Sequence, residues 1–346
     1  MSSDSKLYIS DACEAFWLEY YPQKCPTAKE PWLPERKPLD GLWLPPLKIE
    51  MKNYLLYDGA TFNPGHKAHA EVLKVIYDAA NEHIIPSFKL EMNLAGSLIG
   101  CSADNDLERK VMEQNKDKEG RQIFALPSKV RLDLWCRGIQ QLKLSHFAYV
   151  GGFSLWSDFW LFVEFLETWK GGKYRIRFIR VVKIDRKKDG HSKVFERQQN
   201  AQLFEPLYYK DTPGSGQTSK PTEHIGMEIT IATNSGGQGS WMDENTSEPR
   251  KLLGHTNWEP IKRYGGSDGD RGIWRCERVL KSGDTHKVFY VHVKEDPGAV
   301  QSVDAWSTLA DKNASPKSKL EQLGNAGVFA PEIFMKKAEE MRASSK

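Results

Sequence analysis

Paired cysteines, net charge and long apolar runs are all scarce in this sequence, and each absence excludes a class of protein. The five cysteines include no CxxC pair and are odd in number, which argues against a zinc site and a disulfide framework and favours a reducing compartment. The formal net charge is only +3, too small to predict a nucleic-acid partner, although it suits a local anionic ligand such as phosphate.

No apolar run approaches the roughly 20 residues that a membrane-spanning helix needs. The richest stretch, residues 147–169, is interrupted by polar and acidic side chains, which predicts a buried helix. The opening residues, MSSDSKLY, carry no apolar core of the kind found in signal peptides. We therefore expect a globular protein of the cytoplasm or nucleus, without a membrane partner.

Strands and helices are predicted to alternate, which places the chain in the α/β class with a Rossmann-like core and a parallel sheet. A short apolar strand at residues 54–57 ends at Asp58 and Gly59, and apolar side chains at helical spacing follow over residues 68–80. Further predicted elements are strands at 84–92, 147–150 and 175–184, and helices at 127–144 and 154–169.

Composition divides the chain into four parts. Residues 1–50 form an N-terminal extension that wraps the core and contains one short helix near residues 11–20. Residues 51–188 form the Rossmann-like core. Residues 189–296, with Gly/Ser/Pro-rich tracts between short strands at 227–232, 273–280 and 288–293, predict a β-rich insertion or lid. Residues 297–346 return to helix and complete the core.

The segment between the first strand and its helix carries the strongest chemical signal. It reads Gly-Ala-Thr-Phe-Asn-Pro-Gly-His-Lys-Ala-His over residues 59–69. A helix start has unsatisfied N–H groups and a partial positive charge, so it is a natural anion site. His66 and His69 are three residues apart and face the same side of the helix. Two imidazoles there would stabilise charge on a triphosphate and on its pyrophosphate leaving group.

This segment closely resembles the signature G-x-T/S-F-D/N-P-x-H-x-G-H of the nucleotidyltransferase superfamily that includes nicotinamide and nicotinate mononucleotide adenylyltransferases. The positions that match are Gly59, Thr61, Phe62, Asn63, Pro64, His66 and His69. Ala68 stands where the signature has glycine, and its methyl group would narrow the room beside the phosphate that the resemblance implies. Outside this context, a His-x-x-His pair is more often a pair of surface residues that cap a helix. A metal site is not predicted, because no third ligand follows at a suggestive spacing.

The resemblance implies the roles of the residues in this segment. His66 and His69 would bind the triphosphate, with Lys67 nearby. The loop lining the nucleotide site would consist of Gly59, Ala60, Thr61, Phe62 and Asn63.

A weaker match lies near the C-terminus, where the family has S-S-T-x-I/V-R at a helix start. The resemblance implies that Lys317, Ser318 and Lys319 close over the β- and γ-phosphates. Glu321 stands where the family has arginine, so the charge is reversed at that position. The Lys-Ser-Lys cluster also resembles the mobile loop of class I aminoacyl-tRNA synthetases, which share this core fold. An exposed basic helix cap remains the alternative.

Between these two segments the resemblance is thin. Residues 128–134 resemble a family helix that carries an arginine, so Arg131 is a candidate to face the site. The family's G-x-D after a central strand has two candidate positions, residues 151–155 with Phe153 in place of aspartate, and residues 184–186 with Asp185. The sequence leaves this choice open.

The function that the resemblance implies is transfer of a nucleoside monophosphate, AMP from ATP, onto a phosphorylated acceptor such as nicotinamide mononucleotide, as in NAD biosynthesis. Mg²⁺ would bridge the triphosphate, and Trp156 or Trp160 is a candidate to stack on an acceptor ring. Cytidylyltransferases and phosphopantetheine adenylyltransferases share the signature. A nucleotide-binding sensor or scaffold without activity is the alternative from another class, because Glu321 would repel a triphosphate. A homo-oligomer is also left open.

Overall fold

The computed structural model describes most of the chain, and all structural statements below refer to that part. The described residues are 6–26, 43–60, 62–88, 91–116, 123–184, 207–208, 225–227, 229–234, 242–243, 248–252, 254–263, 272–280, 283–292 and 302–344.

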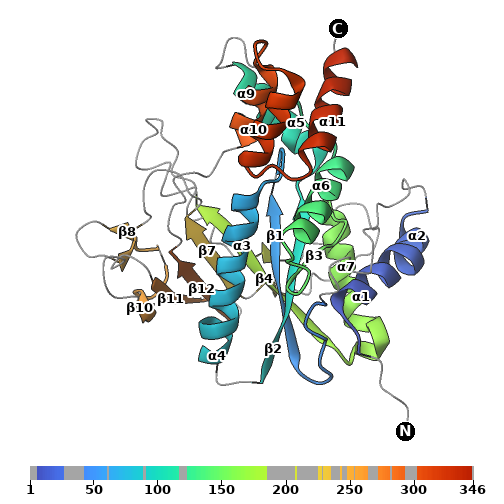
Figure 1. Cartoon of the computed structure of the whole chain (residues 1–346). Coiled ribbons are helices and arrows are strands. Elements are labelled where there is room, and N and C mark those ends of the chain that lie inside the picture. Colours follow the sequence, from blue (N-terminus) through green and yellow to red (C-terminus); the bar gives the residue numbers. More distant parts are fainter. Residues whose placement is uncertain are drawn as a thin grey trace.

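A mostly parallel β-sheet forms the centre of the molecule (Figure 1). Its strand order is β10-β11-β12-β7-β4-β1-β2-β3. The strands from β3 to β12 pair in parallel, whereas β11 and β10 are antiparallel to their neighbours. Their bounds are β1 Lys52–Ala60, β2 Met92–Cys101, β3 Ala148–Val150, β4 Arg175–Ile184, β7 Ile229–Asn234, β10 Glu259–Arg263, β11 Gly272–Val279 and β12 Thr285–Val291.

Two short antiparallel pairs lie outside this sheet. They are β5 (Leu207–Tyr208) with β6 (Ile225–Met227), and β8 (Met242–Asp243) with β9 (Glu248–Pro249).

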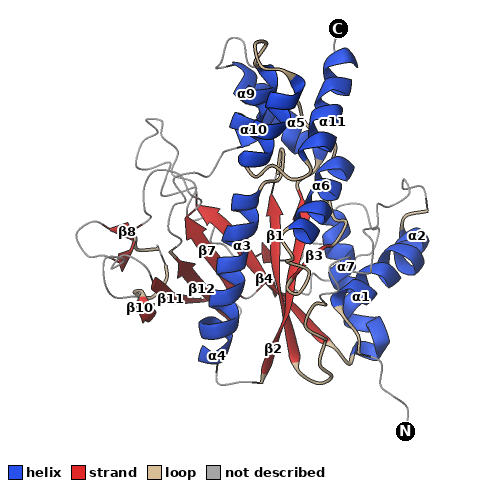
Figure 2. Ribbon diagram, in the orientation of Figure 1, coloured by secondary structure: helices blue, strands red, loops and turns tan. Residues whose placement is uncertain are grey.

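Helices cover both faces of the sheet, and Figure 2 shows the strands as the layer between them. The first face is covered by a helical run of α3 (Lys67–Ala79), the π-helical turn η2 (Ala80–Ile84) and α4 (Ile85–Ser87), and by α6 (Ser128–Gln141). The second face is covered by α7 (Trp156–Thr168) and by the N-terminal run of α1 (Ile9–Ala15), η1 (Phe16–Tyr20) and α2 (Tyr21–Lys24). The 3₁₀ turn η3 (Trp169–Gly172) follows α7.

The remaining helices gather beyond the carboxyl end of β1, as Figure 1 shows. They are α5 (Asp104–Lys116), α9 (Ser302–Ala310), α10 (Pro316–Asn325) and α11 (Pro331–Ser344). None of the described helices is long and apolar enough to cross a membrane.

The strand order reverses at β1. The chain passes from β1 to β2 and β3 over the first face, then crosses through α7 on the second face to β4 on the other side of β1. In open α/β sheets ligands bind outside the carboxyl ends of the strands at such a reversal. The loop after β1 lies at this place, and the overall arrangement is compatible with a Rossmann-like α/β fold.

The N-terminal extension packs on the core through its helices. Phe16 and Trp17 are buried against the aromatic side chains of α7 and of the loop before it. The Trp17 indole donates a hydrogen bond to the carbonyl of Gly151 at 2.8 Å. Tyr21 donates to Asp158 of α7 at 3.2 Å. The predicted short helix is confirmed, and it runs longer than expected.

Most predicted elements are confirmed, but the predicted strand at 84–92 is wrong. Ile84 and Ile85 continue the apolar face of α3, because Leu73, Tyr77 and Ile84 recur at helical spacing and are all buried. Pro86 lies in the last turn of this helical run, which directly follows the π-helical turn η2, and the run ends one residue later at Ser87. The strand begins only at Met92.

The structure also changes the interpretation of residues 189–296. Their described strands β7, β10, β11 and β12 continue the central sheet, with β7 paired in parallel to β4. The described part of this stretch therefore extends the core sheet rather than forming a separate β-rich unit. The domain boundaries drawn from composition stay a prediction.

Candidate functional site

The loop after β1 is held between the carboxyl end of that strand and the start of α3. Asp58, the last buried residue of β1, precedes Gly59, which is exposed, and Ala60. The Ala60 carbonyl accepts a hydrogen bond from the N–H of Ser102 just after β2, at 3.0 Å. Gly59 and Ala60 therefore lie at the carboxyl edge of the sheet. Thr61 lies outside the described residues.

His66 and His69 are brought together as the sequence predicts. Their rings stack with centroids 3.8 Å apart and planes inclined by 29°. His66 is the extended N-cap residue of α3, and its N–H donates to Nδ1 of His69 at 3.4 Å. Because Nδ1 of His69 accepts this bond, the neutral ring carries its proton on Nε2. His66 is buried and His69 is half-buried.

Phe62 supports these rings from below. It is buried, with a positive φ of 43°, and its ring meets that of His69 edge to face at 5.2 Å. Trp135 of α6 packs on Phe62 at 4.8 Å. Phe62 thus shapes the imidazole pair from the protein side.

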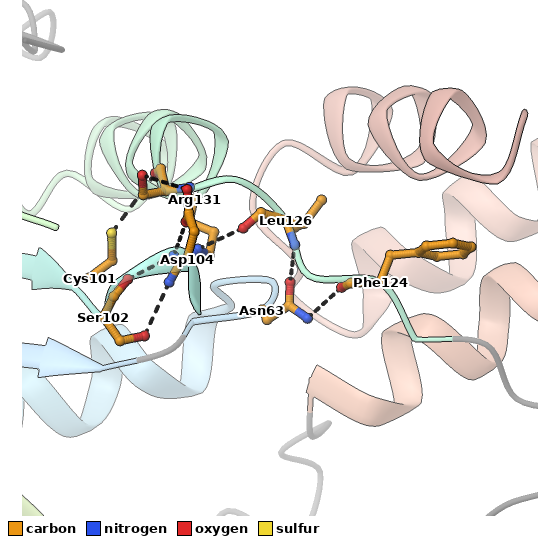
Figure 3. A network of polar contacts seen from close by, with 8 residues as sticks. Asn63, Cys101, Ser102, Asp104, Phe124, Leu126 and Arg131 are labelled. Atoms are coloured by element: carbon orange, nitrogen blue, oxygen red, sulfur yellow. Dashed lines mark hydrogen bonds and ion pairs between the residues drawn. The ribbon is translucent and has the colours of Figure 1, made fainter. Parts of the chain in front are cut away.

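Asn63 ties the loop to the segment before α6 (Figure 3). Its amide nitrogen donates to the carbonyl of Phe124 at 2.8 Å, and its amide oxygen accepts from the N–H of Leu126 at 3.1 Å. Its backbone carbonyl accepts from the indole of Trp306 in α9 at 3.0 Å. The Asn63 side chain therefore holds the loop in shape instead of facing a ligand.

Arg131 is fully buried, and its guanidinium is surrounded by protein acceptors (Figure 3). It donates to the carbonyls of Leu126 at 2.9 Å and Ser102 at 2.8 Å, and it pairs with Asp104 at 2.7 Å. These bonds connect the end of β2, the start of α5 and the segment held by Asn63. Arg131 therefore has a structural role in the described part of the chain, and its predicted contact with a ligand stays a prediction.

The segment between α10 and α11 pairs with the helix start. The Lys67 N–H donates to the carbonyl of Gly327 at 2.8 Å, and the Phe329 N–H donates to the carbonyl of Gly65 at 3.2 Å. The His69 N–H donates to the carbonyl of His66 at 3.0 Å. Of the first three N–H groups of α3, those of Lys67 and His69 therefore have protein acceptors. The anion site predicted at this helix start therefore relies more on the imidazoles than on free backbone groups.

The side chain of Lys67 is exposed and forms a surface ion pair with Glu71, 3.1 Å apart. Such an exposed pair is worth little. Lys67 can therefore turn toward a ligand at small cost.

The C-terminal cluster at the start of α10 divides into different roles. Lys319 donates to the carbonyl of Leu309 at 3.1 Å, so its charge lies at the carboxyl end of α9, where a helix favours a cation. The Ser318 hydroxyl accepts from Gln322 at 3.2 Å. Lys317 and Glu321 are exposed. Of the predicted phosphate contacts in this cluster, only Lys317 keeps a side chain directed to solvent.

Of the two candidate positions for the missing aspartate, the structure describes one. Phe153 is fully buried and packs against Phe16, Trp17 and α7. It fills the aromatic core and offers no polar group. Asp185 lies outside the described residues.

Several residues that shape this site were not predicted from the sequence. Trp135, Trp306 and Phe329 each touch the loop, and a side chain at Gly65 would meet Trp135 at 3.0 Å and Phe329 at 3.1 Å. The signal in the sequence for this contact was the short apolar pair Val328-Phe329, in the segment between the last two helices.

Within the described residues, no group of three or more His, Cys, Asp or Glu side chains is placed to hold a metal ion. A scan against protein-family models found no match for the chain, and searches of curated proteins and of solved structures found none either.

Proposed function

We propose that this protein is a nucleotidyltransferase with a Rossmann-like core. It moves a nucleoside monophosphate, most simply AMP from ATP, onto a small phosphorylated acceptor and releases pyrophosphate. The observation that carries this proposal is the stacked pair of His66 and His69 at the start of α3. The pair stands beyond the carboxyl end of β1, where the strand order reverses and where α/β sheets bind their ligands.

The reaction needs positioning and charge stabilisation, and no protein nucleophile. An oxygen of the acceptor phosphate attacks the α-phosphorus in line and forms the new P–O bond. The bond from the α-phosphorus to the bridging oxygen breaks, and pyrophosphate leaves with the electron pair. His66, His69 and the positive end of α3 stabilise the charge that develops on the phosphates. Lys67, the first residue of α3, and Lys317 have exposed side chains, and we assign them to the phosphates as further cations.

Mg²⁺ enters this reaction with the triphosphate, as part of the substrate. The ion is commonly held by substrate phosphates and waters with few protein ligands. The described residues do not supply a cluster that would hold it alone, so each role assigned above belongs to the chain's own residues.

An aromatic surface near the loop suits a ring-bearing acceptor. Trp156 is 48% exposed at the start of α7, and its ring lies 5.6 Å from that of Tyr57. A side chain added at Gly59 would lie 3.3 Å from the Tyr57 hydroxyl, so this surface adjoins the loop. Trp160 stacks behind Trp156 at 6.1 Å. We propose nicotinamide mononucleotide as the acceptor to test first. The alternative is a cytidylyltransferase activity, with a phospho-alcohol as the acceptor.

One set of contacts favours a second candidate, a nucleotide-binding sensor without turnover. The Lys67 N–H is bonded to Gly327, Lys319 is bonded to α9, and Glu321 places a negative charge on α10. These features weaken the hold on a full triphosphate. A monophosphate or dinucleotide would then bind without reaction.

The deciding experiment is pyrophosphate release by the full chain with Mg²⁺. ATP and CTP are each tested with nicotinamide mononucleotide, nicotinate mononucleotide, phosphocholine and phosphopantetheine. We expect one nucleotide–acceptor pair to release pyrophosphate in step with product. Tight nucleotide binding without release by any pair would favour the sensor. If the chain neither binds a nucleotide nor releases pyrophosphate, both proposed functions are contradicted.

A further inference from the structure

A row of polar side chains crosses four neighbouring strands, away from the loop after β1. Arg180 of β4 pairs with Thr230 of β7, and Arg278 of β11 pairs with His286 of β12. Thr230 and His286 are linked by a hydrogen bond of 3.1 Å between Oγ1 and Nε2. Paired residues on adjacent strands point to the same face. The four side chains therefore share one side of the sheet.

Apolar clusters flank this row on the same face. Phe178 of β4, two residues before Arg180, belongs to the cluster beneath α7. Ala232 of β7 and Val288 of β12 belong to a separate cluster over the outer strands. The polar row thus interrupts an otherwise apolar surface, which calls for a specific reason.

His286 is the centre of the row. Its side chain is fully buried, and its Nδ1 has no hydrogen-bond partner among the residues that the structure describes. When the Thr230 hydroxyl donates to Nε2, Nδ1 carries the proton and becomes a buried donor. Buried polar groups in native proteins nearly always have a partner. Such a donor requires an acceptor.

Among the described residues, the charged groups that act on His286 are all cationic. Burial first, and then the positive charges of His255, Arg180, Arg278 and Lys287, lower the pKa of His286 to about 3. The His255 ring lies 6.2 Å from that of His286, and it comes from the loop over the outer strands.

Two of the neighbouring cations can be placed more closely. Arg278 runs along Gly254, beside His255, with its Cδ 3.9 Å from where a Cβ would lie. Lys287 points to the other face, with its ammonium 5.6 Å from the Phe88 ring. Burial lowers the pKa of Arg180, so its charge is weakly screened by water.

We propose that His286, Thr230, His255, Arg180 and Arg278 form a second anion site, which binds the phosphate group of a small molecule. Guanidinium groups match phosphate oxygens in geometry, and the imidazole and hydroxyl add further donors. Arg180 lies four residues before the end of β4, so this site is in the body of the sheet. It is separate from the loop after β1 and does not depend on the proposed reaction.

Calorimetric titration of the full chain tests the site. Inorganic phosphate and glycerol 3-phosphate are the two probes, with sodium chloride at matched ionic strength as the reference. We expect saturable phosphate binding that Arg278→Gln and Arg180→Gln each weaken at least about tenfold, the effect of losing one charge-assisted hydrogen bond. Arg275→Gln, on the same strand as Arg278 and paired with Glu259 at 2.7 Å, should bind like wild type. Tighter binding of glycerol 3-phosphate would identify a phosphate monoester as the ligand.

Two further measurements keep the test decisive. His66→Ala should leave phosphate binding at this site unchanged, which separates it from the proposed nucleotide site. In wild-type protein labelled at histidine, phosphate should shift the ring signals of His286, identified by their loss in His286→Gln. Unchanged His286 signals, or equal binding by the Arg278→Gln and Arg275→Gln variants, would overturn the proposal.

Discussion

Single residues in the loop after β1 divide into those that shape it and those that can act. Asn63 and Phe62 match the family signature, yet their side chains face the protein: one bonds Phe124 and Leu126, and the other packs beneath His69. His66 and His69 remain as the polar pair of the loop. The residues that match the signature therefore include some that shape the loop and some that can face a ligand, and sequence alone does not separate the two.

The shaping role of Asn63 can be measured against a matched residue. Asn63→Ala leaves a buried carbonyl and a buried N–H without partners, so we expect a loss of about 2 kcal/mol of unfolding free energy and a fall in turnover. Asn115 makes the same two kinds of bond, to Ile123, on a half-buried surface. Asn115→Ala should lower stability less and leave turnover unchanged. Urea denaturation and pyrophosphate release are the measurements, and equal effects of both variants on turnover would refute a special role for Asn63.

The role proposed for His66 in stabilising charge on the phosphates predicts a different pattern. His66→Ala should reduce pyrophosphate release at least about tenfold, because one charge-stabilising donor is lost, while the circular dichroism spectrum stays unchanged. His83 lies later in the same helical run and serves as the control. His83→Ala should keep wild-type turnover. Wild-type rates in His66→Ala would remove this residue from the mechanism.

His286 predicts a pH effect on stability in the absence of phosphate. Its pKa is about 3 in the folded chain and its ordinary value is 6.5. Between these values the unfolded chain binds a proton that the folded chain does not, so stability falls as the pH falls below about 6.5. The unfolding free energy of wild type should decline up to about 1.4 kcal/mol per pH unit more steeply than that of His286→Gln. If the unfolding free energies of wild type and His286→Gln fall in parallel from pH 7 to pH 4, the His286 ring is not buried in its neutral form.

At the scale of elements, local patterns predicted most helices and strands, whereas contacts between distant elements were not predictable. The apolar side chains of residues 154–169 predicted α7 correctly, and the helical spacing of apolar residues over 68–80 predicted α3 correctly. The pairing of Gly65 and Lys67 with Phe329 and Gly327 joins positions more than 250 residues apart. No periodicity encodes such a contact. The error at residues 84–92 arose because an apolar pair fits a strand and a helix face equally well.

The pairing of the C-terminal segment with α3 depends on Gly327. Its φ is +72°, and a side chain there would meet the Lys67 Cβ at 2.8 Å. Gly327→Ala should therefore cost about 1–2 kcal/mol of stability and disturb nucleotide binding. Gly324 lies in α10 with nothing within 4 Å of its position, so Gly324→Ala should be neutral or slightly stabilising. Thermal unfolding of the two variants compares them directly, and equal melting temperatures would show that the contact is unimportant.

At the scale of the whole molecule, the α/β class and the place of the loop were predictable. The alternation of elements fixed the class, and the position of the glycine turn after the first apolar strand placed the loop at the sheet edge. The extent of the sheet was not predictable, because short strands between loop-rich tracts look the same in an insertion and in a sheet continuation. Only the register of β7 with β4 decides that question.

The most direct test of the proposed nucleotide site is a crystal structure with Mg²⁺ and an ATP analogue whose bridge between the α- and β-phosphates is not cleavable. We predict its phosphate oxygens within hydrogen-bonding distance of ring nitrogens of His66 and His69, beside the start of α3. An analogue bound elsewhere, with both rings facing protein, would contradict the proposed site.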